Sequence, residues 1–188
     1  MAAAPQQSLS TLDEPVSVTI MRDLRAIGEK LKYVMLPTSR HDKMRGLRDW
    51  DLWGPFFLCI ILSLLLSAQA GNSQSGYVFA MIFILVWIGS AVVTINAHLL
   101  QGRVSFFQSV CVLGYCLAPL VISALACGIL VQLSLSWFKL IVIIAGFLWS
   151  TSSSVGFMSE LLPEDRKLLG VYPVFLFYFA VAWVILVA

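Results

Sequence analysis

Charged residues are scarce in this sequence. Its 188 residues include 12 lysines and arginines and 10 aspartates and glutamates, together 12%, whereas 60% are hydrophobic and the mean hydropathy is +0.90. Soluble domains are about half apolar and about a quarter charged. The composition therefore excludes an ordinary soluble domain and predicts an all-α membrane protein.

Histidine occurs only twice, as His41 and His98. A serine nucleophile needs a base within reach, and the serine-rich run from Ser150 to Ser154 has no neighbouring histidine. It also lacks the Gly-x-Ser-x-Gly pattern of a nucleophile elbow. We therefore predict that the protein is not an enzyme. We also predict no cofactor and no nucleic-acid partner.

Cysteine is sparse, and its placement argues against disulfides or a metal site. All four cysteines lie inside apolar runs, where a thiol behaves as a small buried hydrophobe. They are Cys59, Cys111, Cys116 and Cys127.

Five apolar runs predict five membrane spans. They cover residues 55–70, 77–100, 106–131, 137–158 and 169–188, so that residues 55–188 form one transmembrane domain. The first run is shorter than the roughly 20 residues that cross a typical hydrocarbon core, which favours a thin bilayer such as that of the early secretory pathway.

The middle of each predicted span contains no charged residue. Transporters and channels usually carry intramembrane charges or paired broken helices, and five spans show no obvious inverted repeat. A channel or transporter therefore has no support in the sequence, although it remains an alternative.

The basic residues predict the orientation. With a cytosolic N-terminus, 11 of the 12 lysines and arginines fall on the cytosolic side, and only Lys139 lies outside. Because cytosolic loops are enriched in basic residues, we predict a cytosolic N-terminus and, after five spans, a lumenal C-terminus.

The segment before the first span has two predicted parts. Residues 1–16 are poor in large apolar groups, which predicts disorder. Residues 17–54 are predicted to form a cytosolic amphipathic helix followed by a basic linker. The apolar stripe of that helix consists of Ile20, Leu24, Ile27, Leu31 and Val34. Three partners remain open for the stripe: an anionic leaflet, a partner protein, or the protein's own spans.

Two stretches predict special helix geometry. Gly54 and Pro55 open the first span, where we expect Gly54 to serve as the cap and Pro55 to occupy the first helical position. In the third span, Pro119 frees the carbonyl of Tyr115 and predicts a kink, while Gly114 offers a neighbouring helix a close approach. In the fourth span, Gly146, Ser150 and Ser154 recur at four-residue spacing and indicate helix packing.

These same stretches resemble a known family. Asp51, Leu52, Trp53, Gly54 and Pro55 form a run similar to the Asp-Leu-Tyr-Gly-Pro signature of the Yip domain family, and Gly114-Tyr115-x-x-x-Pro119 matches its second signature. Trp53 replaces the signature tyrosine and keeps an amphipathic ring there. The chain from about Thr19 to its end looks like the sixth-member branch of that family.

The resemblance implies a function. Yip proteins are membrane proteins of the Golgi and endoplasmic reticulum that interact with Rab GTPases. It implies a non-enzymatic scaffold in vesicle trafficking, located in the Golgi membrane and cycling with the endoplasmic reticulum. The implied partners are membrane lipids, other Yip-family proteins in homo- or hetero-oligomers, and Rab GTPases. A lipid-handling or bilayer-shaping protein, similar to a scramblase, is the alternative.

Overall fold

The computed structural model describes residues 16–35, 52–71, 74–100, 105–132, 136–161 and 167–187. Within these ranges the chain is helical and contains no strand, which confirms the all-α prediction. The helices are α1 (Val16–Met35), α3 (Trp53–Gln69), α4 (Ser75–Leu99), α5 (Phe106–Tyr115), α6 (Ala118–Gln132), the short 3-10 turn η1 (Ser136–Phe138), α7 (Lys139–Leu161) and α8 (Lys167–Val187). Of residues 1–16, which were predicted to be disordered, Val16 is the first residue of α1, and residues 1–15 lie outside the described residues, as does the basic linker.

Helix lengths and composition fit a multi-span membrane protein. Among the described residues, four helical stretches are long and apolar enough to cross a membrane: Ser75–Leu99, Phe106–Gln132, Lys139–Gly156 and Lys167–Val187. The apolar helix α3 is shorter, with 17 residues. Each stretch satisfies most of its own backbone hydrogen bonds, as a lipid environment requires.

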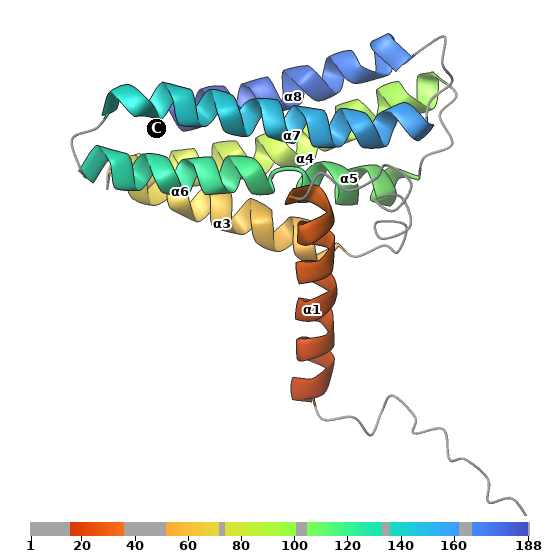
Figure 1. The fold of residues 1–188 in the computed structure, drawn as a ribbon, viewed down its shortest axis with the longest axis horizontal. Helices are drawn as coiled ribbons and strands as arrows, with labels where there is room; N and C mark the ends of the chain where they lie inside the picture. Colours follow the sequence, from red (N-terminus) through yellow and green to blue (C-terminus); the bar gives the residue numbers. More distant parts are fainter. Residues whose placement is uncertain are drawn as a thin grey trace, which may run out of the picture.

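Five of the helices pack side by side as a ring. Contacts link α3 with α4, α4 with α8, α8 with α7, α7 with α6, and α6 with α3. The five ring helices lie side by side, and α5 continues the line of α6 (Figure 1). Helix α5 contacts α3, α4 and α7, and every residue from Ser109 to Val121 is buried. The end of α5 is therefore the centre of the domain.

Small residues bring the ring helices close together. A Cβ atom on Gly89 of α4 would overlap the ring of Phe177 on α8, and one on Gly146 of α7 would overlap the hydroxyl of Ser123 on α6. The Ser123 Oγ lies 3.0 Å from the carbonyl oxygen of Pro119 and 3.2 Å from that of Val142, so it bridges α6 and α7. Such small-residue contacts are typical of helix association in lipid.

The third predicted span is broken into two helices. Helix α5 ends at Tyr115, a turn covers Cys116 and Leu117, and α6 begins at Ala118. The proline ring of Pro119 is incompatible with a regular helix around the carbonyl of Tyr115, and the backbone N–H of Leu117 instead donates to the carbonyl of Gly114 at 3.2 Å. The predicted kink is thus a full interruption located just before the proline.

Helix α1 stands crosswise to the others (Figure 1). Its C-terminal end touches α5 and α6, and the rest of the helix projects away from the bundle. The only part of α1 that the bundle holds in place is therefore its last turns.

Candidate functional site: the signature contact and the α1 dock

The two signature motifs, far apart in sequence, pack directly on each other. A Cβ atom on Gly54 would overlap the Tyr115 hydroxyl and lie 2.6 Å from the ring atom Cε1. A Cβ atom on Gly114 would overlap the Pro55 ring and lie 3.0 Å from the Pro55 Cα. Each glycine thus accommodates the large residue of the other motif. We call these four residues, Gly54, Pro55, Gly114 and Tyr115, the signature contact.

The signature contact is an interior feature. All four residues are buried, and Tyr115 is fully enclosed. Leu52 and Trp53 lie at its edge and are exposed, Trp53 to 62%, with the Trp53 ring 5.9 Å from that of Phe57. Asp51 lies outside the described residues. The first signature therefore divides into an exposed aromatic edge and a buried Gly-Pro pair.

The capping roles predicted for Gly54 and Pro55 are wrong. Helix α3 begins at Trp53 with Leu52 at the N-cap position, so Gly54 and Pro55 are its second and third residues. Proline is accepted there because the first four N–H groups of a helix have no intrahelical partner. Gly54 lacks a side chain because Tyr115 occupies that space, and not because the start of the helix needs a flexible N-cap residue.

The second signature ends at Pro119, just past the break. Ala118 and Pro119 are buried at the start of α6, and the Pro119 carbonyl accepts the hydrogen bond from Ser123. On the N-terminal side of the break, the Tyr178 hydroxyl of α8 donates to the carbonyl of Leu113 at 3.0 Å. These bonds hold both sides of the interruption in place.

Helix α1 docks on the signature contact through its last turns. The Lys30 Nζ lies 5.9 Å from the centroid of the Tyr115 ring, and Lys30 is only 7% exposed. Val34 is buried, and its carbonyl oxygen accepts a hydrogen bond from the Ser153 Oγ of α7 at 3.3 Å. Tyr115 therefore joins three helices, α1, α3 and α5.

The predicted apolar stripe of α1 divides into two halves. Ile27, Leu31 and Val34 pack against the core of the domain. Ile20 and Leu24 are 54% and 53% exposed. Packing on the protein's own helices therefore accounts for Ile27, Leu31 and Val34 but not for Ile20 and Leu24.

Two serines of the fourth span are buried, and a third has a role that the pattern did not predict. Ser150 and Ser154 are fully buried, and their hydroxyl oxygens have no hydrogen-bond partner among the described atoms. Ser153, which lies off the four-residue pattern, is the serine that reaches α1. The described residues contain no group of three histidine, cysteine or acidic side chains placed to hold a metal ion.

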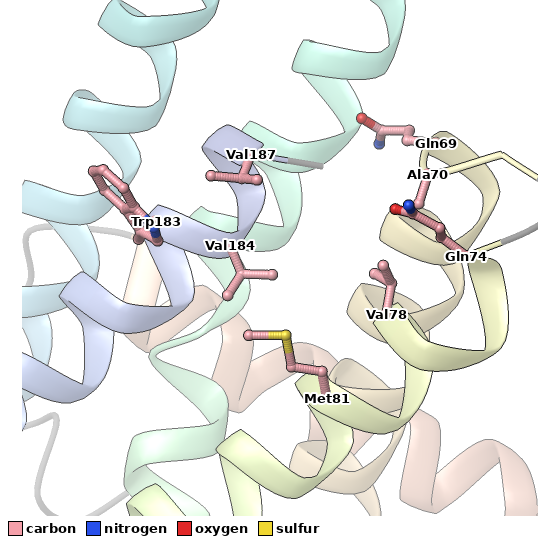
Figure 2. A pocket seen from close by; sticks show the side chains of 8 residues that line it. All are labelled: Gln69, Ala70, Gln74, Val78, Met81, Trp183, Val184 and Val187. Atoms are coloured by element: carbon pink, nitrogen blue, oxygen red, sulfur yellow. The ribbon is translucent and has the colours of Figure 1, made fainter.

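A cavity opens at the other end of the bundle, far along the helices from the signature contact. It has a volume of about 330 Å³ and lies between the end of α3, the start of α4 and the end of α8. Figure 2 shows Val184 and Val187 on one side and Gln69, Gln74 and Val78 on the other. The Gln69 amide also donates to the carbonyl of Ala124 at 3.1 Å. The cavity is thus apolar with amides at its rim.

The signature contact itself has no comparable space. Beside Pro55 and Gly114 a gap of about 20 Å³ remains, which holds about one water molecule. Small-molecule sites usually have volumes of about 300–1,000 Å³. The signature contact is therefore a packing and docking element rather than a ligand pocket.

Sequence reasoning missed Lys30 and Ser153 as contacts of α1. Lysine is nearly always exposed unless it is paired, so the sequence alone does not predict a buried Lys30. The available signal was its position one residue from the apolar stripe, next to Leu31. Only the three-dimensional arrangement brings it over Tyr115.

The arrangement defines a multi-span all-α membrane protein in which two short motifs meet at the centre and fix an amphipathic helix. A family model described as the Yip1 domain matches residues 32–184, and the chain belongs to that family. Protein YIPF6 of Xenopus tropicalis is 47% identical over 99% of this chain and 82% of its own length. The protein YIPF6 homolog of Dictyostelium discoideum is 47% identical over 95% of this chain and 96% of its own length.

A more distant relative shares most of the chain. Protein YIP4 of Schizosaccharomyces pombe is 39% identical over 93% of this chain and 75% of its own length. No solved structure matches this chain.

Proposed function

We propose that the protein is a non-enzymatic scaffold of vesicle trafficking between the Golgi and the endoplasmic reticulum, where it assembles with other Yip-family proteins and contacts Rab GTPases. It resides in the Golgi membrane with its N-terminus in the cytosol and its C-terminus in the lumen. Membership of the Yip1 domain family and the likeness to proteins named YIPF6 and YIP4 support this assignment.

The observation that carries the proposal is the attachment of α1 to the signature contact. The two signature motifs pack on each other inside the domain and leave no space for a substrate. Their contact instead positions helix α1, whose Lys30 lies over Tyr115. With the N-terminus in the cytosol, α1 displays exposed Arg22 and Arg25 there. This basic surface is suited to an acidic patch on a cytosolic partner.

The test is co-purification of GTPases with the full chain, expressed with an affinity tag in cells and extracted in mild detergent. The double substitution Arg22→Glu with Arg25→Glu should remove Rab GTPases from the purified material and leave Yip-family proteins in place. The charge-conserving pair Arg22→Lys with Arg25→Lys is the matched control and should keep them. Unchanged GTPase recovery with the Glu variant, or no GTPase with the unsubstituted chain, contradicts the proposed contact.

A lipid-handling role is the second candidate, and the cavity of Figure 2 favours it. Its apolar walls and its rim of Gln69 and Gln74 suit an acyl chain with a polar head. Filling the cavity by Val184→Trp would then abolish lipid flip in liposomes that contain only the purified chain. Absence of flip with the unsubstituted chain rejects this candidate.

A further inference from the structure

The N-terminal half of the apolar stripe of α1 is not covered by the bundle. Ile20 and Leu24, which form this half, are 54% and 53% exposed. Ile20 and Leu24 continue the line of Ile27, Leu31 and Val34, which the bundle buries. The uncovered half therefore continues the apolar surface that packs against the bundle.

The orientation of α1 indicates that it lies along the membrane surface. Helix α1 runs crosswise to helices that cross the bilayer (Figure 1), so it runs along the membrane plane. This is the direction that interfacial amphipathic helices adopt. A helix that displayed its stripe to a cytosolic protein would need no such alignment.

The depth of α1 follows from α3. Lys30 lies over Tyr115, and Tyr115 packs on Gly54, so α1 is level with the start of α3. At 1.5 Å per residue the 17 residues of α3 extend about 25 Å, slightly less than the roughly 30 Å of a hydrocarbon core. The exposed Trp53 at the start of α3 suits the headgroup level, which puts the start of α3, and α1 beside it, near the boundary between the hydrocarbon and the headgroups.

The charges of α1 suit the same location. The helix carries Arg22, Arg25, Lys30 and Lys32 against Asp23 and Glu29. Arg22, Arg25 and Lys32 are exposed. Basic residues next to a membrane surface are attracted to anionic lipids.

We propose that the Ile20–Leu24 half of α1 is a lipid-binding surface, inserted among the headgroups and upper acyl chains of an anionic leaflet. The bundle anchors the helix at Lys30 and Val34, and the leaflet holds the remainder. The polar side, with Arg25 and Glu29, stays in water. The insertion of Ile20 and Leu24 concerns the opposite side of the helix from the proposed GTPase contact, and its test requires no GTPase.

The test uses the full chain reconstituted in liposomes of phosphatidylcholine and phosphatidylserine, with an environment-sensitive fluorophore on one introduced cysteine. The four native cysteines are buried, and the unsubstituted chain measures their background labelling. Labels at Ile20→Cys and Leu24→Cys should be quenched severalfold more by brominated acyl chains than labels at Arg25→Cys and Glu29→Cys. Replacing phosphatidylserine by phosphatidylcholine should reduce that difference.

Three results would contradict the inference. The first is equal and weak quenching at all four positions, which would place the stripe in water or against a second copy of the chain. The second is strong quenching at Arg25 and Glu29 with little at Ile20 and Leu24, which would reverse the orientation of the helix. Quenching that does not respond to phosphatidylserine would contradict the anionic preference.

Discussion

The hydroxyl of Ser153 in α7 donates a hydrogen bond to the carbonyl of Val34 in α1, 119 residues earlier in the chain. The carbonyls of the last helical turn have no intrahelical donor, and Val34 lies one residue before the end of α1. The bond therefore satisfies an acceptor at the helix end while joining α1 to the bundle. Together with Lys30 over Tyr115, it makes α1 an integral part of the membrane domain.

Removing the charge of Lys30 should loosen α1. A cation over an aromatic ring is worth about 2 kcal/mol when it is desolvated, so Lys30→Gln should raise the opening of α1 roughly 10–30-fold. Hydrogen–deuterium exchange of residues 16–35 measures this. Lys32→Gln, at an exposed position of the same helix, is the control. Equal exchange in the two variants would mean that Lys30 does not anchor the helix.

A methyl group at Gly114 should destabilise the domain. Its Cβ would overlap the rigid Pro55 ring, and overpacking a buried site costs about 1–3 kcal/mol. Thermal unfolding in detergent should show a clearly lower midpoint for Gly114→Ala. Gly76→Ala is the control, because its added Cβ would meet nothing within 4 Å outside its own helix backbone. A midpoint for Gly114→Ala as high as that of the control would argue against the contact with Pro55.

The Tyr178 hydroxyl should make a modest contribution to stability. It donates to the Leu113 carbonyl within the buried centre, and hydrogen bonds between membrane helices average about 0.6 kcal/mol, with a maximum near 1.7. Tyr178→Phe should lower the free energy of unfolding by that amount in detergent. Tyr172→Phe, at a position that is 65% exposed, should change little. A loss well above 2 kcal/mol would indicate a larger hydrogen-bond network.

The helices α3 to α8 were predictable because they coincide with the apolar runs of the sequence. A long apolar segment in lipid has few choices other than a helix, so the all-α class follows from composition. The break before Pro119 was predictable in kind, since proline removes a donor and displaces a carbonyl. Its position at Cys116 and Leu117 was not, because a short turn can form on either side of that carbonyl.

The pairing of Gly54 with Tyr115 was not predictable from one sequence. Each glycine has a local explanation, a cap for Gly54 and a small face for Gly114, and the local explanation was correct only for Gly114. The contact depends on the register between α3 and α5, which side-chain packing across the whole ring determines. The burial of Lys30 depends on the same register, because that register places the Tyr115 ring beside its charge.

The most direct test of the account is a double-mutant cycle between Gly54 and Tyr115. Gly54→Ala alone should lower the free energy of unfolding by about 1–3 kcal/mol through its clash with the Tyr115 ring. Gly76→Ala, where the added Cβ would meet nothing within 4 Å outside its own helix backbone, is the control. In a Tyr115→Leu background the clash is gone, so the account predicts a much smaller cost for Gly54→Ala. Equal costs in the two backgrounds would show that the two signatures do not meet, and the dock built on them would be contradicted.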